Sequence, residues 1–231
     1  MNNSFVLKGN ICQTITSKEL DLHENAFAVC VDGVSKGVFD ILPEEYTDLP
    51  LWDHGDALIF PGMVDLHVHA PQYAFRGMCM DLELMDWLNR YTFPEEEKYE
   101  DLEYAKKAYG LFVDALKNSA TTRACIFATC HRPATELLMK LMEESGLVSF
   151  VGKVNMDREA SPALTEASAD ISAYTTFGWI NAVKDKFRNT MPILTPRFIP
   201  CCTDQLMEEL RQIQMAYGIP VQSHLSESKG E

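Results

Sequence analysis

The sequence predicts an α/β protein, with a small β domain over residues 1–57 followed by parallel βαβ units over residues 58–231. Two observations predict this fold. Short alternating segments separated by turn residues fill the first part, which is the pattern of strands and hairpins. Apolar β-type runs alternate with helical patterns in the second part, as in a parallel sheet with crossover helices. The second part is therefore either a doubly wound sheet or a (β/α)8 barrel.

Two short strands are expected in the first domain. Ala26–Val31 and Gly37–Leu42 each alternate between side chains suited to opposite faces of a sheet. Asp32 and Gly33 lie between them, and Asp-Gly favours a tight hairpin turn. Pro43 marks the end of the second strand because proline cannot donate a backbone hydrogen bond.

Five strands and five helices are expected in the second domain. The apolar β-type runs cover residues 57–69, 121–129, 147–156, 192–198 and 219–224. The helical patterns cover residues 83–91, 95–117, 134–145, 164–188 and 203–217. A complete barrel takes eight strands and about 250 residues, so a barrel with five strands would stop early.

Local signals mark several helix ends. Pro94 precedes the helix expected over 95–117 and suits a helix start. Thr203 is an expected N-cap, since its hydroxyl can accept a hydrogen bond from the first turn. Gly146 and Gly218 stand where helices commonly end on a left-handed residue.

The composition is that of a soluble globular protein, and it excludes several partners. Of the 231 residues, 46% are hydrophobic and 23% are charged, and the formal net charge is −14. An acidic surface repels phosphate backbones and anionic lipids, so neither nucleic acid nor a membrane is an expected partner. The sequence shows neither the roughly 20 apolar residues of a membrane helix nor a signal-peptide pattern, so a cytoplasmic location is expected.

The cysteine pattern excludes two kinds of site. The seven cysteines include no C-x-x-C pair, so neither a disulfide framework nor a zinc ribbon is expected. The P-C-x-x-C and H-x-E elements of cytidine-type deaminases are also absent from the sequence. That class of zinc deaminase is therefore excluded.

The sharpest chemical signal is the segment Pro61-Gly-Met-Val-Asp-Leu-His67-Val-His69. Residues two apart on a strand point to the same face, so the two imidazoles converge. At the C-terminal end of a barrel strand, where such folds carry their active sites, the pair is suited to bind zinc. An isolated H-x-H is also common as a structural or surface pair, and that alternative stays open on this segment alone.

A second signal is the tetrad His224-Leu-Ser-Glu227 at the end of the last expected strand. A catalytic zinc commonly has three protein ligands and a water, and His224 would supply a third imidazole. Glu227 would be suited to move protons between that water and a substrate. The plain alternative is a polar tetrad that only ends a strand.

These segments together resemble the amidohydrolase superfamily. Pro61 to His69 is similar to the first-strand metal motif of that superfamily. Further segments are similar to guanine deaminases and keep their order: His69-Ala-Pro-Gln72-Tyr-Ala-Phe75, Trp87-Leu-Asn-Arg-Tyr91-Thr-Phe-Pro94, Phe150-Val-Gly-Lys-Val154, Thr195-Pro-Arg197-Phe198 and Gln222-Ser-His224-Leu-Ser-Glu227. The resemblance implies an incomplete (β/α)8 TIM barrel of about five βα units, preceded by part of a small β-sandwich domain.

The resemblance also implies a metal and a catalytic residue. His67, His69 and His224 would bind one Zn²⁺ ion, with iron as an alternative because imidazole sites accept several metals. Glu227 would be the catalytic proton shuttle. His131 follows the second strand at a family-like position and is expected beside the site rather than as a ligand.

The substrate contacts follow from the same resemblance. Gln72 and Arg197 would hydrogen-bond the purine, and Phe198 would lie beside its ring. A neutral amide and a guanidinium suit the carbonyl and ring nitrogens of guanine, while an aromatic ring suits its face. The metal ligands and the shuttle that would also contact the substrate are His69, His224 and Glu227.

The implied function is guanine deamination, a step of purine catabolism that converts guanine and water to xanthine and ammonia by zinc-activated hydroxide attack. Related proteins place a further histidine after the sixth strand and an aspartate after the eighth, and neither falls within this sequence. The chain is therefore expected to be the N-terminal part of such an enzyme and to be inactive alone; intact members are expected to be homodimers. Two alternatives are another amidohydrolase that deaminates or dechlorinates a heterocycle, and a non-catalytic fragment that binds metal or a complementary half.

Overall fold

A computed structural model describes residues 3–229 and divides the chain into two compact units. The first unit ends at Gly62 and the second begins at Met63. The predicted boundary at residue 57 falls inside strand β4 (Leu51–Ile59), so the sequence run over 57–69 belongs to two different sheets. Phe60 to Gly62 separate them.

The first unit is a four-stranded sheet in the order β3-β2-β1-β4. Strands β1 (Phe5–Thr16), β2 (Glu19–Val31) and β3 (Val34–Phe39) are antiparallel neighbours, whereas β4 runs parallel to β1. Asp32 and Gly33 join β2 to β3 with positive φ angles of 53° and 78°. A two-residue turn with both φ angles positive fits the twist of a hairpin, as the Asp-Gly pair predicted. A short 3₁₀ helix, η1 (Glu44–Tyr46), follows β3.

The second unit is a mixed α/β fold around a parallel sheet in the order β5-β6-β7-β9. Its strands are β5 (Met63–His69), β6 (Thr121–Phe127), β7 (Val148–Gly152) and β9 (Thr190–Pro192). Strands β8 (Val154–Asn155) and β10 (Thr195–Pro196) form a separate parallel pair. The strand expected over 219–224 is reduced to two parallel bridges, Leu194 to Val221 and Phe198 to His224.

The helices follow the strands in sequence but differ from the expected ranges. The expected helix over 95–117 is broken at Asp101, whose extended backbone and side chain cap α3 (Leu102–Lys117). The helix expected over 164–188 is shorter because Ser168 caps α5 (Ala169–Val183). The N-cap Thr203 and the left-handed residues Gly146 and Gly218 are confirmed at the ends of α4 (Arg132–Ser145) and α6 (Asp204–Tyr217).

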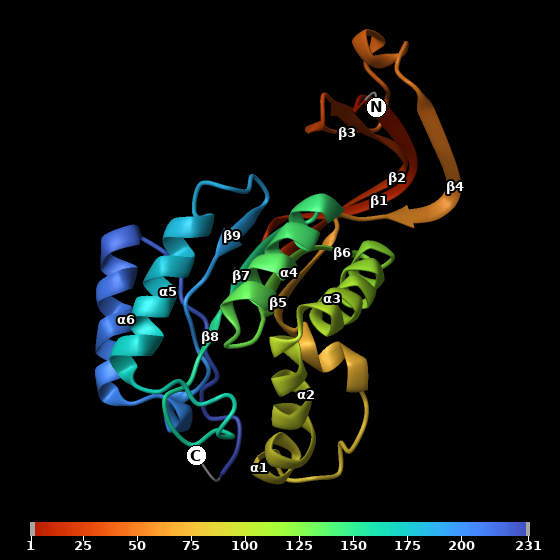
Figure 1. The fold of residues 1–231 in the computed structure, drawn as a ribbon. Helices are drawn as coiled ribbons and strands as arrows, with labels where there is room; N and C mark the ends of the chain where they lie inside the picture. The colour runs from red at the N-terminus through yellow and green to blue at the C-terminus, as the bar shows by residue number, and fades with distance from the viewer. Residues whose placement is uncertain (1–2, 230–231) are drawn as a thin grey trace. The chain divides into compact units, whose positions relative to one another are not determined.

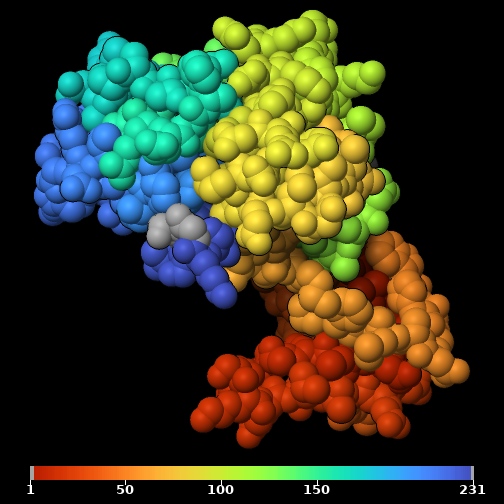
Figure 2. Space-filling model, turned by 90° about the horizontal axis from the view of Figure 1, so that it is seen from below, coloured from red at the N-terminus to blue at the C-terminus, as the bar shows by residue number. Residues whose placement is uncertain are grey.

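The segment between β5 and α3 is a series of short helical turns. It contains the 3₁₀ helix η2 (Pro71–Phe75), α1 (Leu84–Trp87), the π-helix η3 (Leu88–Thr92), α2 (Phe93–Glu97) and η4 (Lys98–Glu100). Another 3₁₀ helix, η5 (Ile199–Cys201), precedes α6. In the space-filling view, the yellow segment that contains α1 and α2 lies against the blue residues near the C-terminal end (Figure 2).

Two apolar clusters organise the second unit. The larger one lies where helices α3 to α6 pack on the sheet, with Trp179, Tyr109 and Ile126 fully buried (Figure 1). The smaller one joins Phe127, Phe198, Leu88 and Phe93 near the C-terminal ends of the strands. The second cluster supports the residues of the site described below. Within residues 3–229, no helix is long and apolar enough to cross a membrane.

Candidate metal centre and its pocket

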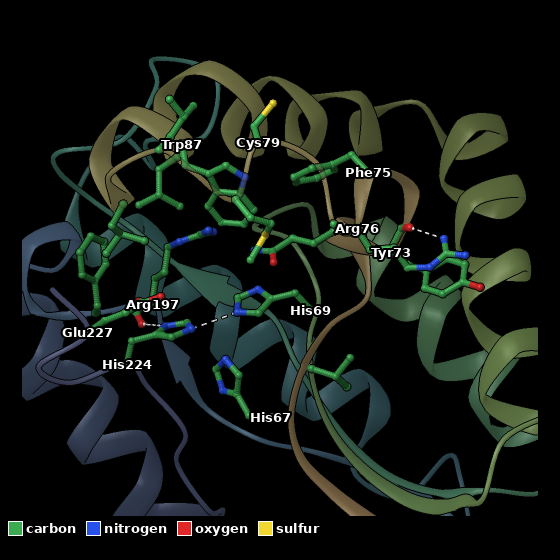
Figure 3. Close-up of a pocket in the computed structure, with 18 residues that line it drawn as sticks. His67, His69, Tyr73, Phe75, Arg76, Cys79, Trp87, Arg197, His224 and Glu227 are labelled. Carbon is green, nitrogen blue, oxygen red and sulfur yellow. Dashed lines mark hydrogen bonds between the residues drawn. The ribbon is translucent and has the colours of Figure 1, made fainter.

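Three histidines from distant parts of the second unit meet at one point. His67 and His69 lie on β5, and His224 is placed by its bridge to Phe198. Each histidine offers one ring nitrogen, and these three nitrogens all lie within 4.8 Å of one another. No other group of three potential metal ligands lies this close together in the described part of the chain. Figure 3 shows the three imidazoles facing one another.

Hydrogen bonding fixes which nitrogen of His224 faces the cluster. Its Nδ1 lies 2.6 Å from the carbonyl oxygen of Arg197. A carbonyl only accepts, so Nδ1 carries the proton and Nε2 presents a lone pair. That Nε2 lies 3.0 Å from Nε2 of His69, on the side that faces His67. A histidine held in this way is prepared for metal coordination, because the outer hydrogen bond sets both its tautomer and its orientation.

The surroundings of His69 and His224 favour the neutral form of these two imidazoles. Burial lowers the pKa of His69 well below its usual value, and the positive charge of Arg197 lowers it further. Burial also lowers the pKa of His224. A metal ligand must be deprotonated, so the environment of the two rings favours the form that coordinates.

The donor set fits a zinc ion. Three neutral imidazoles leave a fourth position for water, which is the arrangement of many catalytic zinc sites. Nδ1 of His69 is buried and has no hydrogen-bond partner among the described residues, whereas its Nε2 faces His224. None of the seven cysteines belongs to the cluster, and all of them lie within the described range as free thiols.

Phe127 forms a wall behind the histidines. It is the last residue of β6 and fully buried, and its ring centroid lies 4.5 Å from that of His69 in a stacked arrangement. The rings of His67 and His224 lie 5.0 and 4.6 Å away. Sequence reasoning missed this residue, although its position at the end of a predicted strand beside the H-x-H strand was the available signal.

The cluster opens into a cavity of about 630 Å³, a size typical of small-molecule sites. All of the predicted site residues line this one cavity: His67, His69, Gln72, Arg197, Phe198, His224 and Glu227. Gln72 comes from η2, and Phe198 is buried at the start of η5. Phe75 and Trp87 form part of the opposite wall, and their rings lie 5.7 Å apart (Figure 3).

Arg197 is held by a residue that sequence reasoning did not single out. Its Nη1 donates to Oε2 of Glu96 at 2.7 Å, and both side chains are at most 3% exposed. Burial is the largest single effect and disfavours the charged guanidinium, but the charge of Glu96, its hydrogen bond and smaller effects of other acidic neighbours together outweigh burial and raise the pKa of Arg197. The two residues are 101 positions apart, so no local pattern links them.

His131 lies outside the set that lines the cavity. It stands at the N-terminal end of α4, and burial lowers its pKa. Its Nε2 is buried without a hydrogen-bond partner in the described range. The expectation that His131 neighbours the site rather than binds the metal stays a prediction.

Known proteins are similar to this chain in sequence. Residues 58–231 match the Amidohydrolase family. The chain is 41% identical to guanine deaminase of Dictyostelium discoideum over 180 residues, which cover 78% of this chain and 40% of that protein. It is 33% identical to guanine deaminase of Escherichia coli strain K12 over 180 residues, again 78% of this chain and 40% of the relative.

A solved structure is similar over nearly the whole chain. The crystal structure of guanine deaminase from C. acetobutylicum with bound guanine in the active site superposes with a TM-score of 0.94 at 42% identity. The match covers 99% of this chain and 54% of that one. The chain thus spans about half or less of the length of these relatives. The matched region, the parallel sheet and the histidine cluster at its strand ends lead to one conclusion, that the chain belongs to the amidohydrolase family.

Proposed function

We propose that these residues form the metal-binding and purine-binding part of a guanine deaminase, which hydrolyses guanine to xanthine and ammonia. The observation that carries the proposal is the convergence of three histidines, an amide, a buried guanidinium and a carboxylate on one cavity. The similarity to the guanine deaminase that was solved with guanine in its active site supports the choice of substrate.

His67, His69 and His224 would hold a zinc ion. When bound, zinc lowers the pKa of a coordinated water and so supplies a nucleophile at neutral pH. Iron is the alternative metal, because imidazole ligands suit it as well. The hydrogen bond from His224 Nδ1 to the Arg197 carbonyl supports this role, since it turns the Nε2 lone pair toward the other two histidines.

The remaining residues of the cavity would bind guanine and move protons. Gln72 can both donate and accept, and Arg197 can only donate, so together they suit the carbonyl and ring nitrogens of the purine edge. Phe198 would cover the ring. Glu227 would take a proton from the attacking water and pass it to the ring nitrogen next to the amino-bearing carbon. The second proton of the added water then passes to the amino group, the carbon–nitrogen bond breaks, ammonia leaves, and the added oxygen becomes the new carbonyl group of xanthine.

The fold of the whole site belongs to the same proposal. The parallel sheet of the second unit would be part of a (β/α)8 barrel, and the first unit part of a small β-sandwich domain. The position of the histidines supports the barrel, because barrel enzymes place their sites at the C-terminal ends of the strands and His69 is the last residue of β5. A homodimer is proposed for the intact enzyme.

A ligand panel tests the proposed substrate. The zinc-loaded chain is titrated by calorimetry with guanine, adenine, cytosine and a chlorinated triazine. Guanine is expected to bind at least about tenfold more tightly than the others, because adenine and the triazine lack the carbonyl group that Arg197 would bind, and the single ring of cytosine makes fewer contacts with the cavity. A metal-free sample is the control and is expected to bind guanine more weakly. Equal affinity across the panel, or no guanine binding, would contradict the proposal.

A further inference from the structure

The guanidinium of Arg197 is contacted by one helical segment and is almost completely shielded from solvent. The side chain is 3% exposed, and its one ion pair within the described residues is with Glu96 on α2. The Arg197 Cζ atom also lies 5.2 Å from the centroid of the Phe93 ring, on the same helix. A carboxylate thus fixes one end of the guanidinium, and an aromatic ring lies against it.

The sequence of this segment explains why both contacts come from one helix. Phe93 and Glu96 are three residues apart, so they share a face of α2. Pro94 has no N–H and would clash with the carbonyl of Arg90 in a regular α-helix. The π-helix η3 over Leu88–Thr92 contains that carbonyl, and its wider turn accommodates the proline. Pro94 therefore accounts for the turn that presents Phe93 and Glu96 to Arg197.

We propose that Glu96, supported by Phe93, is a positioning residue that makes Arg197 selective for the carbonyl group of the purine. The inference rests on the proposed function. A guanidinium has five N–H donors in a rigid fork, and Glu96 takes one of them at Nη1. Because the fork is planar, the hydrogen bond at Nη1 and the contact with the Phe93 ring together restrict where the remaining donors point. Guanine offers its carbonyl oxygen to these donors, whereas a purine without that oxygen leaves them buried and unpaired.

A purely stabilising ion pair is the competing explanation, and the chain contains a matched example of one. Lys153 is fully buried and donates to Glu166 at 2.6 Å. Neither residue lines the cavity. Glu166→Gln therefore removes the charge of a buried ion pair without touching Arg197. Glu96→Gln removes the same charge beside Arg197, so comparing the two variants separates positioning from stability.

The first measurement follows Arg197 without any ligand. The chain is labelled with ¹⁵N-arginine, and the Arg197 signals are assigned with Arg197→Lys. In the unchanged chain, slow rotation of the clamped guanidinium is expected to give separate Nη signals. Glu96→Gln is expected to average these signals, and Glu166→Gln is expected to leave them separate. Identical Arg197 signals in the unchanged chain and in Glu96→Gln would contradict the claim that Glu96 orients the guanidinium.

The second measurement follows selectivity. Zinc-loaded chains are titrated with guanine and with 2-aminopurine, which keeps the amino group and lacks the carbonyl. Glu96→Gln is expected to weaken guanine binding at least about tenfold and to change 2-aminopurine binding less than about threefold. Glu166→Gln is expected to lower the melting temperature but to preserve the ratio of the two affinities. A ratio that is unchanged in Glu96→Gln would overturn the positioning role.

The two measurements distinguish the inference from the proposed function. If the unchanged chain binds neither purine, the proposed function is contradicted, and the Arg197 signals alone decide whether Glu96 orients the guanidinium. If guanine binds and Glu96→Gln keeps both its selectivity and its Arg197 signals, the proposed function stands and the inference is wrong.

Discussion

Three imidazoles whose ring nitrogens lie within 4.8 Å of one another would repel if all were protonated, and the surroundings of His69 and His224 disfavour the protonated form of these two rings. Burial is the largest effect on His69 and His224, and it lowers the pKa of each. The nearby Arg197 adds positive charge, which also lowers the pKa of both rings. The backbone carbonyl of Arg197 also accepts a hydrogen bond from His224 and so orients its ring. One residue thus contributes to both the charge state and the geometry of the cluster.

Replacing one histidine tests whether the cluster binds metal. His224→Asn is expected to weaken zinc binding at least about 100-fold, because even the outer hydrogen-bond partners of metal ligands contribute about 10- to 100-fold. His131→Asn is the control, since it also removes a half-buried imidazole but lies outside the cluster. Zinc per chain is measured by elemental analysis after dialysis against a weak chelator. Equal zinc content in the two variants would contradict the assignment.

At the scale of elements, the end of β7 shows how tightly the strands approach near the site. A Cβ atom on Gly152 would lie 1.7 Å from Oγ1 of Thr195 and 2.9 Å from Nε2 of Gln222. Gln222 also donates to Thr195 and to the carbonyl of Ile126, so one side chain joins three strand segments. Only glycine leaves room for these contacts, and this explains the Phe150-Val-Gly-Lys-Val154 segment in packing terms.

Replacing Gly152 by alanine is expected to destabilise the fold. Gly152→Ala is expected to lower the free energy of unfolding by about 1–3 kcal/mol, because the strands must shift to relieve the overlap. Gly110→Ala in α3 is the control, since its Cβ meets nothing within 4 Å and alanine favours helices by about 0.5–1 kcal/mol. Urea unfolding measures both changes. A neutral or stabilising Gly152→Ala would show that the strands are less closely packed than described.

A carboxylate joins helix α4 to the residues just before β9. Glu143 accepts hydrogen bonds from the backbone N–H groups of Arg188 and Asn189 at 3.0 and 2.9 Å. Burial is the largest single effect and would raise the pKa of Glu143, but these hydrogen bonds and those from Thr190 together outweigh burial, so the pKa is lowered below its usual value. The carboxylate therefore stabilises the fold in its ionised form.

The effect of Glu143 on stability is expected to depend on pH. The pKa of Glu143 is lower in the folded chain than in the unfolded chain, where it is about 4.3. Its full contribution to the free energy of unfolding is therefore present above about pH 4.3 and is lost as the pH falls through the pKa of the folded chain. Glu143→Gln is expected to be less stable by about 1 kcal/mol at pH 7, and the difference is expected to shrink below about pH 4. Urea unfolding from pH 7 to pH 3 measures it, with Glu144→Gln on the exposed face as control. A difference that is independent of pH would contradict this account.

The sequence predicted elements where the signal was local. Thr203 begins α6, and Gly146 and Gly218 end α4 and α6, as expected, because capping depends on neighbouring residues. The break at Asp101 was missed, since apolar spacing continues through it although its carboxylate caps a new helix.

The site was predictable only in part, because some of its contacts join residues that no local pattern links. The H-x-H segment and His224 are visible as motifs, but the pairing of Glu96 with Arg197 joins residues far apart in sequence. Phe127 resembles any other apolar residue of a buried strand until the fold places it against three histidines.

At the scale of the whole molecule, the candidate site lies within the second unit, from β5 to Glu227. The match to the amidohydrolase family starts at residue 58 and so includes this unit. Every described ligand of the cluster is a histidine, although the chain also contains seven cysteines and 34 acidic residues that zinc could use instead. We therefore expect a zinc ion to bind to the three histidines rather than to cysteine or carboxylate side chains.

X-ray absorption at the zinc edge tests that claim directly. The chain is loaded with one equivalent of zinc, and the spectrum gives the type and distance of the ligand atoms. Three imidazole nitrogens at about 2.0–2.1 Å are expected, with further oxygen or nitrogen ligands completing the shell. The imidazole scattering is expected to fall in His224→Asn. Sulfur at about 2.3 Å, or a shell without imidazole, would contradict the assignment of His67, His69 and His224 as the metal centre.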